Sequence, residues 1–119
     1  MEKTVVGFPR IGADRELKFW TEQFFAGILD ESALSKNAEL LRAEHEKAQL
    51  DAGIDLFTVN DFSFYDGMLD MAYLLGAVPS RFRSLSLSPL KTYFAMARGY
   101  QGEKGEVKAL SMRKWFCLL

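Results

Sequence analysis

A group of positively charged side chains follows the first apolar stretch of the chain. Arg10, Arg15 and Lys18 lie close together in the sequence, and Glu16 falls among them. Because unpaired backbone N–H groups gather at the start of a helix, cations placed there suit an anionic ligand. Charged residues are also common in the first turn of an ordinary solvated helix, which is the alternative interpretation.

Two carboxylates with interleaved aromatic residues form a second candidate group, at Asp61, Phe62, Tyr65 and Asp66. Such a group can orient a flat heterocycle or serve as an acid–base pair. The alternative is structural, with one Asp in a turn and the other capping the helix that follows. The residue types by themselves leave both interpretations open.

The soft metal ligands of the chain are one histidine, His45, and one cysteine, Cys117. A catalytic zinc ion usually takes three protein ligands and a structural zinc ion four, mostly Cys and His. We therefore predict no metal site within one copy of the chain. His45 falls on an apolar helical stripe, which favours a core histidine over a general base. Cys117 has no neighbouring His, and we interpret it as inert.

Two short apolar runs, Thr4–Phe8 and Ile54–Val59, predict the buried strands that carry these loops, because both runs are rich in β-branched and aromatic residues. A long helical stretch separates them, and helical crossovers normally join parallel strands. The predicted fold class is α/β, a partial (β/α) barrel-type unit with two or three parallel strands and several helices. A whole barrel needs eight strands and about 250 residues, so residues 1–119 are predicted to form a single partial domain.

Apolar residues at helical spacing predict four helices, with capping residues at their ends. The predicted N-caps are Asp14, then Asp30 or Ser32, then Asp66 and Ser88. The glycines predicted to end the later helices are Gly53, Gly76 and Gly99. The apolar stripes of the first two helices are Leu17, Trp20, Phe24 and Ile28, and then Leu34, Ala38, Leu41, His45 and Ala48.

The charge balance argues against two classes of partner. The chain has 15 basic and 16 acidic residues and a net charge of −1, so no excess of positive charge attracts nucleic acid or an anionic membrane. No stretch approaches the ~20 apolar residues that span a bilayer, and the first residues do not resemble a signal peptide. With a single cysteine, these features predict a cytoplasmic protein.

Five segments, taken in order, resemble the N-terminal domain of the cobalamin-independent methionine synthase family. The resemblance runs from about Val5 to Phe116, nearly the whole chain. Each motif is weak alone, but five in order with similar spacing are hard to obtain by chance. The segments are Gly7–Gly12 (GFPRIG), Arg15–Lys18 (RELK), Ala52–Leu56 (AGIDL), Asp61–Asp66 (DFSFYD) and Met112–Phe116 (MRKWF).

The resemblance implies an activity: the family moves the methyl group of 5-methyltetrahydropteroyltriglutamate to homocysteine, which makes methionine. It also implies two (β/α)8 barrels, of which the second carries the catalytic zinc and the first helps to bind the folate. The family's folate-contact residues map onto Arg15, Glu16, Leu17, Lys18 and Lys114. A cationic loop suits the polyglutamate tail because the tail is a string of carboxylates.

The departures from the family pattern shape the remaining expectations. Asn60 stands where the family usually has glycine, and the sequence after Phe116 becomes Cys117-Leu118-Leu119 and stops. The zinc ligands and the homocysteine pocket belong to the second barrel, so we expect this chain alone to hold no cofactor, to carry no catalytic residue and to be inactive. The chain looks truncated, and its expected partners are polyglutamylated folate and either a second copy or the missing C-terminal barrel. The alternative hypothesis is a non-catalytic module that self-associates through exposed strand edges and apolar surface.

Overall fold

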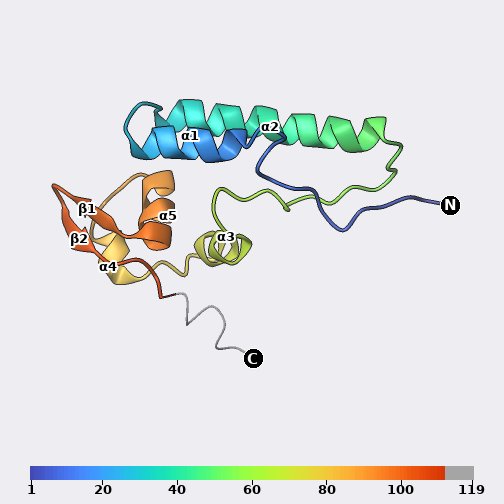
Figure 1. The fold of residues 1–119 in the computed structure, drawn as a ribbon. Coiled ribbons are helices and arrows are strands. Elements are labelled where there is room, and N and C mark those ends of the chain that lie inside the picture. Colours follow the sequence, from blue (N-terminus) through green and yellow to red (C-terminus); the bar gives the residue numbers. More distant parts are fainter. Residues whose placement is uncertain (112–119) are drawn as a thin grey trace. The chain divides into compact units, whose positions relative to one another are not determined.

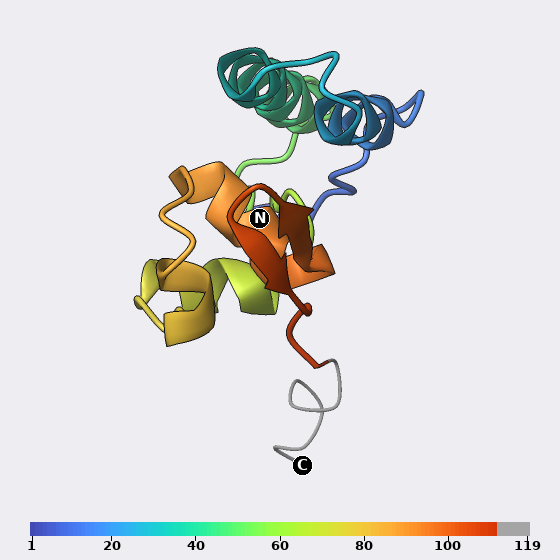
Figure 2. The ribbon, with the colours of Figure 1, turned by 90° about the vertical axis from the view of Figure 1, so that its left-hand side faces the viewer.

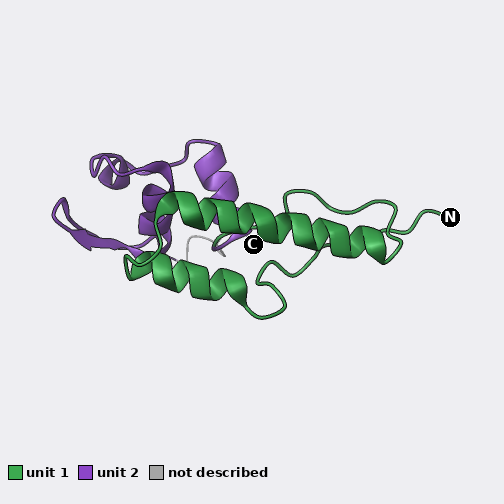
Figure 3. Cartoon of the chain, turned by 90° about the horizontal axis from the view of Figure 1, so that it is seen from above, with its two compact units in different colours: residues 1–64 green, residues 65–119 purple. Residues whose placement is uncertain are grey.

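The computed structural model describes residues 1–111 (Figure 1). The chain divides into two compact units, residues 1–64 and residues 65–119 (Figure 3). The segment from Met112 onward, which includes Lys114 and Cys117, lies outside the described residues. In the described part, no helix has the length and apolar character that a membrane span requires.

The two helices of unit 1 lie side by side (Figures 1 and 2). They are α1, Glu16–Phe25, and α2, Glu31–Asp51. Of the two residues predicted as the second N-cap, Asp30 and Ser32, the cap is Asp30, because its carboxylate accepts a hydrogen bond of 2.7 Å from the Ala33 N–H. The prediction of Asp14 as the first N-cap is wrong. Arg15 takes that position, with φ of 61° and no side-chain capping bond.

The stripe predicted for the first helix is buried at its start and exposed at its end. Leu17 is 1% exposed, Trp20 and Phe24 are half-buried, and Ile28 is 77% exposed. Ile28 is exposed because α1 ends at Phe25, so it no longer follows the helical repeat. A left-handed Gly27, with φ of 73°, turns the chain toward α2.

The stripe predicted for the second helix holds for three turns and then shifts by one residue. Leu34, Ala38 and Leu41 are buried, whereas Ala48 is exposed and Gln49 is 5% exposed. Gln49 thus takes the buried position that was predicted for Ala48. Gly53 follows the C-cap Ala52 with φ of 78°, as predicted.

The two segments predicted as strands do not form strands in unit 1. They meet in one isolated parallel bridge between Thr4 and Leu56, next to bonds from the Asp55 and Leu56 N–H groups to the Lys3 carbonyl. Val6 and Val59 are largely exposed, so neither segment gains the apolar burial that holds a strand in a sheet. A two-stranded pair without such cover is marginal in water, which accounts for the failed prediction.

Unit 2 packs three short helices around a small apolar core. They are α3, Gly67–Leu74, α4, Ser80–Arg83, and α5, Pro89–Arg98. The predicted N-caps Asp66 and Ser88 are confirmed by position. The prediction missed α4, a single turn whose Phe82 is fully buried. The other side chains of this core that are buried within unit 2 include Leu69, Tyr93, Phe94 and Met96.

A β-hairpin that the sequence analysis did not predict follows α5 (Figure 2). Strand β1, Tyr100–Gly102, pairs antiparallel with β2, Gly105–Val107. Helices and strands together confirm the α/β class in its coarse form. Among residues 1–111, however, the strands are antiparallel rather than parallel, and the barrel-type unit stays a prediction.

Candidate functional site

A tight turn leads into α1, and we call this turn and the first residues of the helix, residues 10–18, the cationic corner. The Leu17 N–H donates to the Ile11 carbonyl at 3.1 Å, and the Arg15 N–H donates to the Gly12 carbonyl at 3.2 Å. Gly12 has φ of 89°, and a Cβ there would collide with the Glu16 side chain. The left-handed conformation therefore favours glycine at this turn, and any larger residue would also displace the Glu16 carboxylate.

The four predicted folate-contact residues of the corner are brought together at the start of α1, but they differ in exposure. Arg15 is exposed and Lys18 partly exposed, with its ammonium 3.5 Å from the Glu22 carboxylate. Glu16 turns back, and its carboxylate accepts from the Asp14 N–H at 3.1 Å. Leu17 is buried, so its side chain anchors the helix while Arg15 and Lys18 present positive charge to solvent.

Asp61 connects two segments that lie far apart in the sequence, which we call the first loop, residues 4–15, and the second loop, residues 54–64. One carboxylate oxygen accepts from the Phe8 N–H at 2.9 Å and from the Thr58 hydroxyl at 2.8 Å. In the opposite direction, the Arg10 guanidinium donates to the Ser63 carbonyl at 2.9 Å and to the Phe64 carbonyl at 3.3 Å. Arg10, predicted as part of an anion-binding group, is thus bonded to backbone carbonyls of the second loop.

Asp66, the other predicted carboxylate, belongs to unit 2 and caps α3. It accepts from the Met68 and Leu69 N–H groups at 2.8 and 3.1 Å, as the structural alternative predicted. The backbone N–H of Tyr65 donates to the Tyr93 hydroxyl at 3.1 Å. Both carboxylates therefore have structural partners, and Asp66 is explained as a helix cap.

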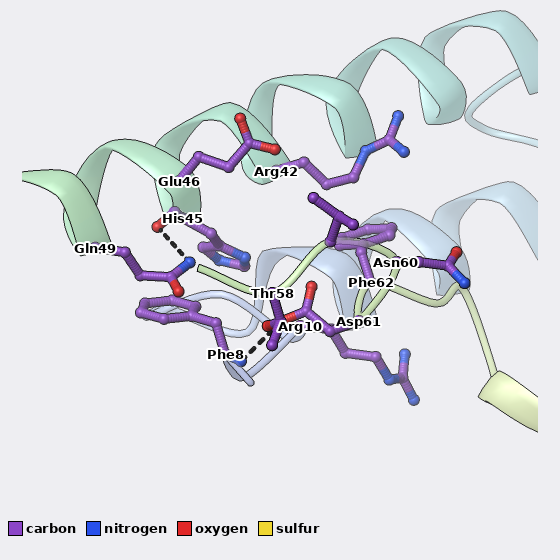
Figure 4. Close-up of a pocket in the computed structure, with 11 residues that line it drawn as sticks. Phe8, Arg10, Arg42, His45, Glu46, Gln49, Thr58, Asn60, Asp61 and Phe62 are labelled. Carbon is purple, nitrogen blue, oxygen red and sulfur yellow. Dashed lines mark hydrogen bonds between the residues drawn. The ribbon is translucent and has the colours of Figure 1, made fainter. Parts of the chain in front are cut away.

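A pocket of about 250 Å³ lies in unit 1 between α2 and the two loops (Figure 4). The Phe8 and His45 rings lie 4.8 Å apart in its wall, and the Arg42 guanidinium sits 5.5 Å from the centre of the Phe62 ring. Its lining residues are Phe8, Arg10, Arg42, His45, Glu46, Gln49, Thr58, Val59, Asn60, Asp61 and Phe62.

Gln49 and His45 show how the pocket wall is held. The Gln49 amide nitrogen donates to the His45 carbonyl at 3.1 Å, while its buried oxygen finds no hydrogen-bond partner among the described residues. His45 is half-buried, and its ring packs against the Phe8 ring. The wall is thus built from ring packing and helix-local bonds.

Asn60 occupies the left-handed region, with φ of 63°. Asparagine is among the few residues other than glycine that adopt this conformation at low cost. This backbone requirement explains why a glycine would also suit the position, and why the departure from the family pattern leaves the loop intact.

The donor set of the described residues does not fit a zinc ion. Within residues 1–111, no group of three or more His, Cys, Asp or Glu side chains lies close enough to hold a metal ion. His45 packs on Phe8, and Asp61 is bonded to the Phe8 N–H and the Thr58 hydroxyl. No step of the function proposed below passes through a metal on this chain.

Sequence reasoning missed the contacts that Arg10 and Gln49 make. Arg10 was grouped with the other cations because it is near them in sequence, and nothing in the sequence pairs it with Ser63. Gln49 was missed because polar residues are not counted in an apolar stripe. Its position, four residues after His45 on the same helix, was the available signal.

Comparison with known proteins agrees with the motifs. The family described as "Cobalamin-independent synthase, N-terminal domain" matches residues 2–117. A 5-methyltetrahydropteroyltriglutamate–homocysteine methyltransferase of Streptococcus gordonii is 51% identical over 116 residues, which are 98% of this chain and 16% of that protein. Proteins of the same name from Streptococcus pneumoniae and Lactococcus lactis are 50% and 49% identical over the same length, again 98% of this chain, covering 16% and 15% of their own chains.

The chain thus spans about one sixth of the length of these relatives. The match nevertheless covers nearly all of its own residues, including both loops, the cationic corner and the pocket. On the extent of this match and the level of identity, the chain belongs to the cobalamin-independent methionine synthase family, where it corresponds to a fragment from the N-terminal domain.

Proposed function

We propose that this chain contributes the folate-tail contacts of a methyl transfer from 5-methyltetrahydropteroyltriglutamate to homocysteine. The proposed substrate-binding residues are Arg15, Glu16, Leu17, Lys18 and Lys114, of which Lys114 lies outside the described residues. The observation that carries the proposal is the cationic corner, which presents Arg15 and Lys18 to solvent from one turn of backbone. The printed names of the relatives supply the reaction.

The chemistry of the corner suits a chain of carboxylates. Arg15 offers a planar fork of N–H donors that can bind a carboxylate in two places, and Lys18 adds a mobile point charge. The Leu17 and Lys18 N–H groups are already bonded to the Ile11 and Arg15 carbonyls, so the positive charge that the corner offers comes from the Arg15 and Lys18 side chains. Glu16 contributes by holding the turn through the Asp14 N–H, and Leu17 by anchoring α1.

A titration with two ligands tests the proposal. Calorimetry of the chain with the triglutamate and monoglutamate forms of 5-methyltetrahydrofolate should give tighter binding of the triglutamate, because its tail adds carboxylates. Lys18→Glu should weaken binding of the triglutamate form more than binding of the monoglutamate form. An absence of heat with either form would reject the tail-binding role.

The chain offers a matched control for the charge reversal. Lys47 pairs with Asp51 four residues on, as Lys18 pairs with Glu22, and both pairs are exposed on helices of unit 1. Lys47→Glu changes the net charge by the same amount at a site away from the corner. It should leave the preference for triglutamate unchanged, and an equal loss in both variants would show a nonspecific charge effect.

The methyl transfer itself is proposed for the full-length relatives, not for this chain alone. We propose that the chain is inactive by itself, has no catalytic residue and needs the zinc-bearing barrel to complete the site. The absence of a cofactor on this chain and its cytoplasmic location also stay predictions. If the purified chain produced methionine from the methyl-folate and homocysteine, the proposal that it is inactive by itself would be contradicted.

Self-association is a second candidate function, favoured by an apolar surface on unit 2. Met68, Met71, Leu74 and Leu75, on and next to α3, are between 42% and 77% exposed. An apolar surface of this kind is commonly covered by another element or another chain. We propose a homo-oligomer when the rest of the protein is absent. Light scattering of the chain at high concentration should give a mass above 13.5 kDa, and a monomer would reject this proposal.

A further inference from the structure

We infer that Arg10 and Asp61 are positioning residues that hold the cationic corner in the shape a folate tail requires. The ligand in this inference rests on the proposed function. Its structural half, that these two side chains order residues 10–18, can be tested without any ligand. Neither residue belongs to the set proposed to touch the folate.

The two side chains form a reciprocal clamp. Asp61, from the second loop, accepts from the backbone N–H of Phe8 in the first loop. Arg10, from the first loop, donates to the backbone carbonyls of Ser63 and Phe64 in the second loop. Each loop therefore supplies one charged side chain that fastens the backbone of the other, across a separation of 53 or 54 residues.

The clamp takes the place of a sheet at this edge of unit 1. One isolated bridge joins Thr4 and Leu56, and the pairing does not continue as a ladder of strands. Hydrogen bonds that involve a charged group are about twice as strong as neutral ones. The Asp55 carboxylate adds one charged contact beside the bridge, because it accepts from the Lys3 N–H at 2.8 Å. The Arg10 and Asp61 contacts are the charged ones that join the two loops next to the cationic corner.

The order imposed by the clamp passes directly into the cationic corner. Ile11, the residue after Arg10, accepts from the Leu17 N–H, and the Arg15 carbonyl accepts from the Lys18 N–H at 3.1 Å. Leu17 is buried, so the far end of the turn is fixed as well. The backbone that carries the Arg15 and Lys18 side chains is thus fixed by the Arg10 contacts before it and by the buried Leu17, which lies between the two residues.

This arrangement favours a ligand with several carboxylates. A mobile corner would lose conformational entropy each time it bound the tail, whereas a corner already in shape loses less. The benefit increases with the number of contacts made together. Loss of the clamp should therefore weaken the triglutamate more than the monoglutamate.

The first test compares the ratio of the two dissociation constants among variants. Asp61→Ala should reduce the preference for triglutamate by about tenfold, as expected for loss of one charged hydrogen-bonding group. Asp61→Asn keeps an acceptor oxygen and should retain most of the preference. Arg10→Lys keeps the positive charge but loses the planar guanidinium, so its preference for triglutamate should lie between those of Asp61→Ala and Asp61→Asn. Asp30→Ala, which removes the N-cap of α2, is the stability control and should leave the ratio unchanged.

The second test needs no ligand. Hydrogen exchange at the Leu17 and Lys18 amides should accelerate in Asp61→Ala beyond its rate in Asp30→Ala. Equal rates in the two variants would overturn the clamp, and a preference that stayed constant while exchange accelerated would overturn its role in tail binding. If the wild-type chain does not prefer triglutamate, the proposed function and the ligand half of the inference fail together, while the exchange rates still decide whether the clamp orders the corner.

Discussion

Asp61 and Asp66 are five residues apart and each accepts two hydrogen bonds, yet they have different structural roles and belong to different units. Asp66 binds the N–H groups of Met68 and Leu69, two and three residues along the chain. Asp61 binds the Thr58 hydroxyl nearby and also the Phe8 N–H, 53 residues away. The local contact starts a helix, and the distant one joins two loops. Residue type alone does not distinguish these roles.

The two units differ in the same way. Unit 2 is fastened over shorter distances, with the Tyr93 hydroxyl donating to Asp70 at 2.6 Å and accepting from the N–H groups of Tyr65 and Asp66. These partners are 23 to 28 residues away and are gathered at the start of α3. Unit 1 instead depends on a bonded pair of loops. Substitutions should therefore have different consequences in the two units.

The largest effect is expected at Tyr93, which is 6% exposed. Tyr93→Phe removes a hydroxyl that serves three partners, and should lower the free energy of unfolding of unit 2 by about 1 to 3 kcal/mol. Tyr73→Phe is the control, because its ring packs edge-on against Tyr93 and no hydroxyl bond is described for it. Chemical denaturation with hydrogen exchange would assign the loss to a unit. A loss of stability in unit 1, or no loss in either unit, would contradict the proposed difference between the two units.

The next effect is expected at Asp61, which is exposed to solvent. Asp61→Ala should cost about 1 to 2 kcal/mol, since water can partly satisfy the Phe8 N–H and the Thr58 hydroxyl. Exchange should accelerate in both loops, around Phe8 and around Thr58. Acceleration confined to the second loop would show that the long-range contact is unimportant.

A smaller effect is expected from Asp66, whose contacts are local. Asp66→Ala should cost about 1 kcal/mol, as is usual for an N-cap, and should accelerate exchange in the first turn of α3. Asp66→Asn should recover most of the loss, because asparagine is an equally good cap. Circular dichroism and exchange would measure both. A loss larger than that of Asp61→Ala would reverse the order that the comparison predicts.

The smallest effect is expected from the two exposed ion pairs of unit 1. Glu22→Gln, which breaks the Lys18 pair, and Asp51→Asn, which breaks the Lys47 pair, should each change the free energy of unfolding by less than about 0.5 kcal/mol. Denaturation in low and high salt would measure the change. A loss above 1 kcal/mol for Glu22→Gln alone would show that the corner depends on this pair.

Local signals in the sequence predicted the helices well. Asp30, Asp66 and Gly53 were identified as capping residues because a cap acts on backbone within a few residues. The same reasoning failed at Asp14, since a left-handed Arg15 has no distinctive composition. It also missed α4 and the β1–β2 hairpin, whose three- and four-residue elements are too short to show a period.

The same distinction between local and distant contacts decides which parts of the candidate site the sequence could predict. The sequence grouped Arg15, Glu16, Leu17 and Lys18 because they are consecutive in the chain. It could not predict that Arg10 turns to the Ser63 carbonyl or that Gln49 lines the pocket, because both depend on residues brought close by folding. The strands failed for a related reason. Strand formation depends on neighbours across the sheet, and neither segment carries that information itself.

By itself the sequence determined the family, the helix boundaries near their caps and the cluster of cations at the start of α1. Each of these features depends on residues that are close together in the chain. Tertiary structure alone decided that Thr4–Phe8 and Ile54–Val59 meet in one bridge, and that Arg10 and Asp61 fasten the two loops. The physical reason is distance along the chain. A contact between residues some 50 positions apart exists only after the intervening helices have packed and brought them together.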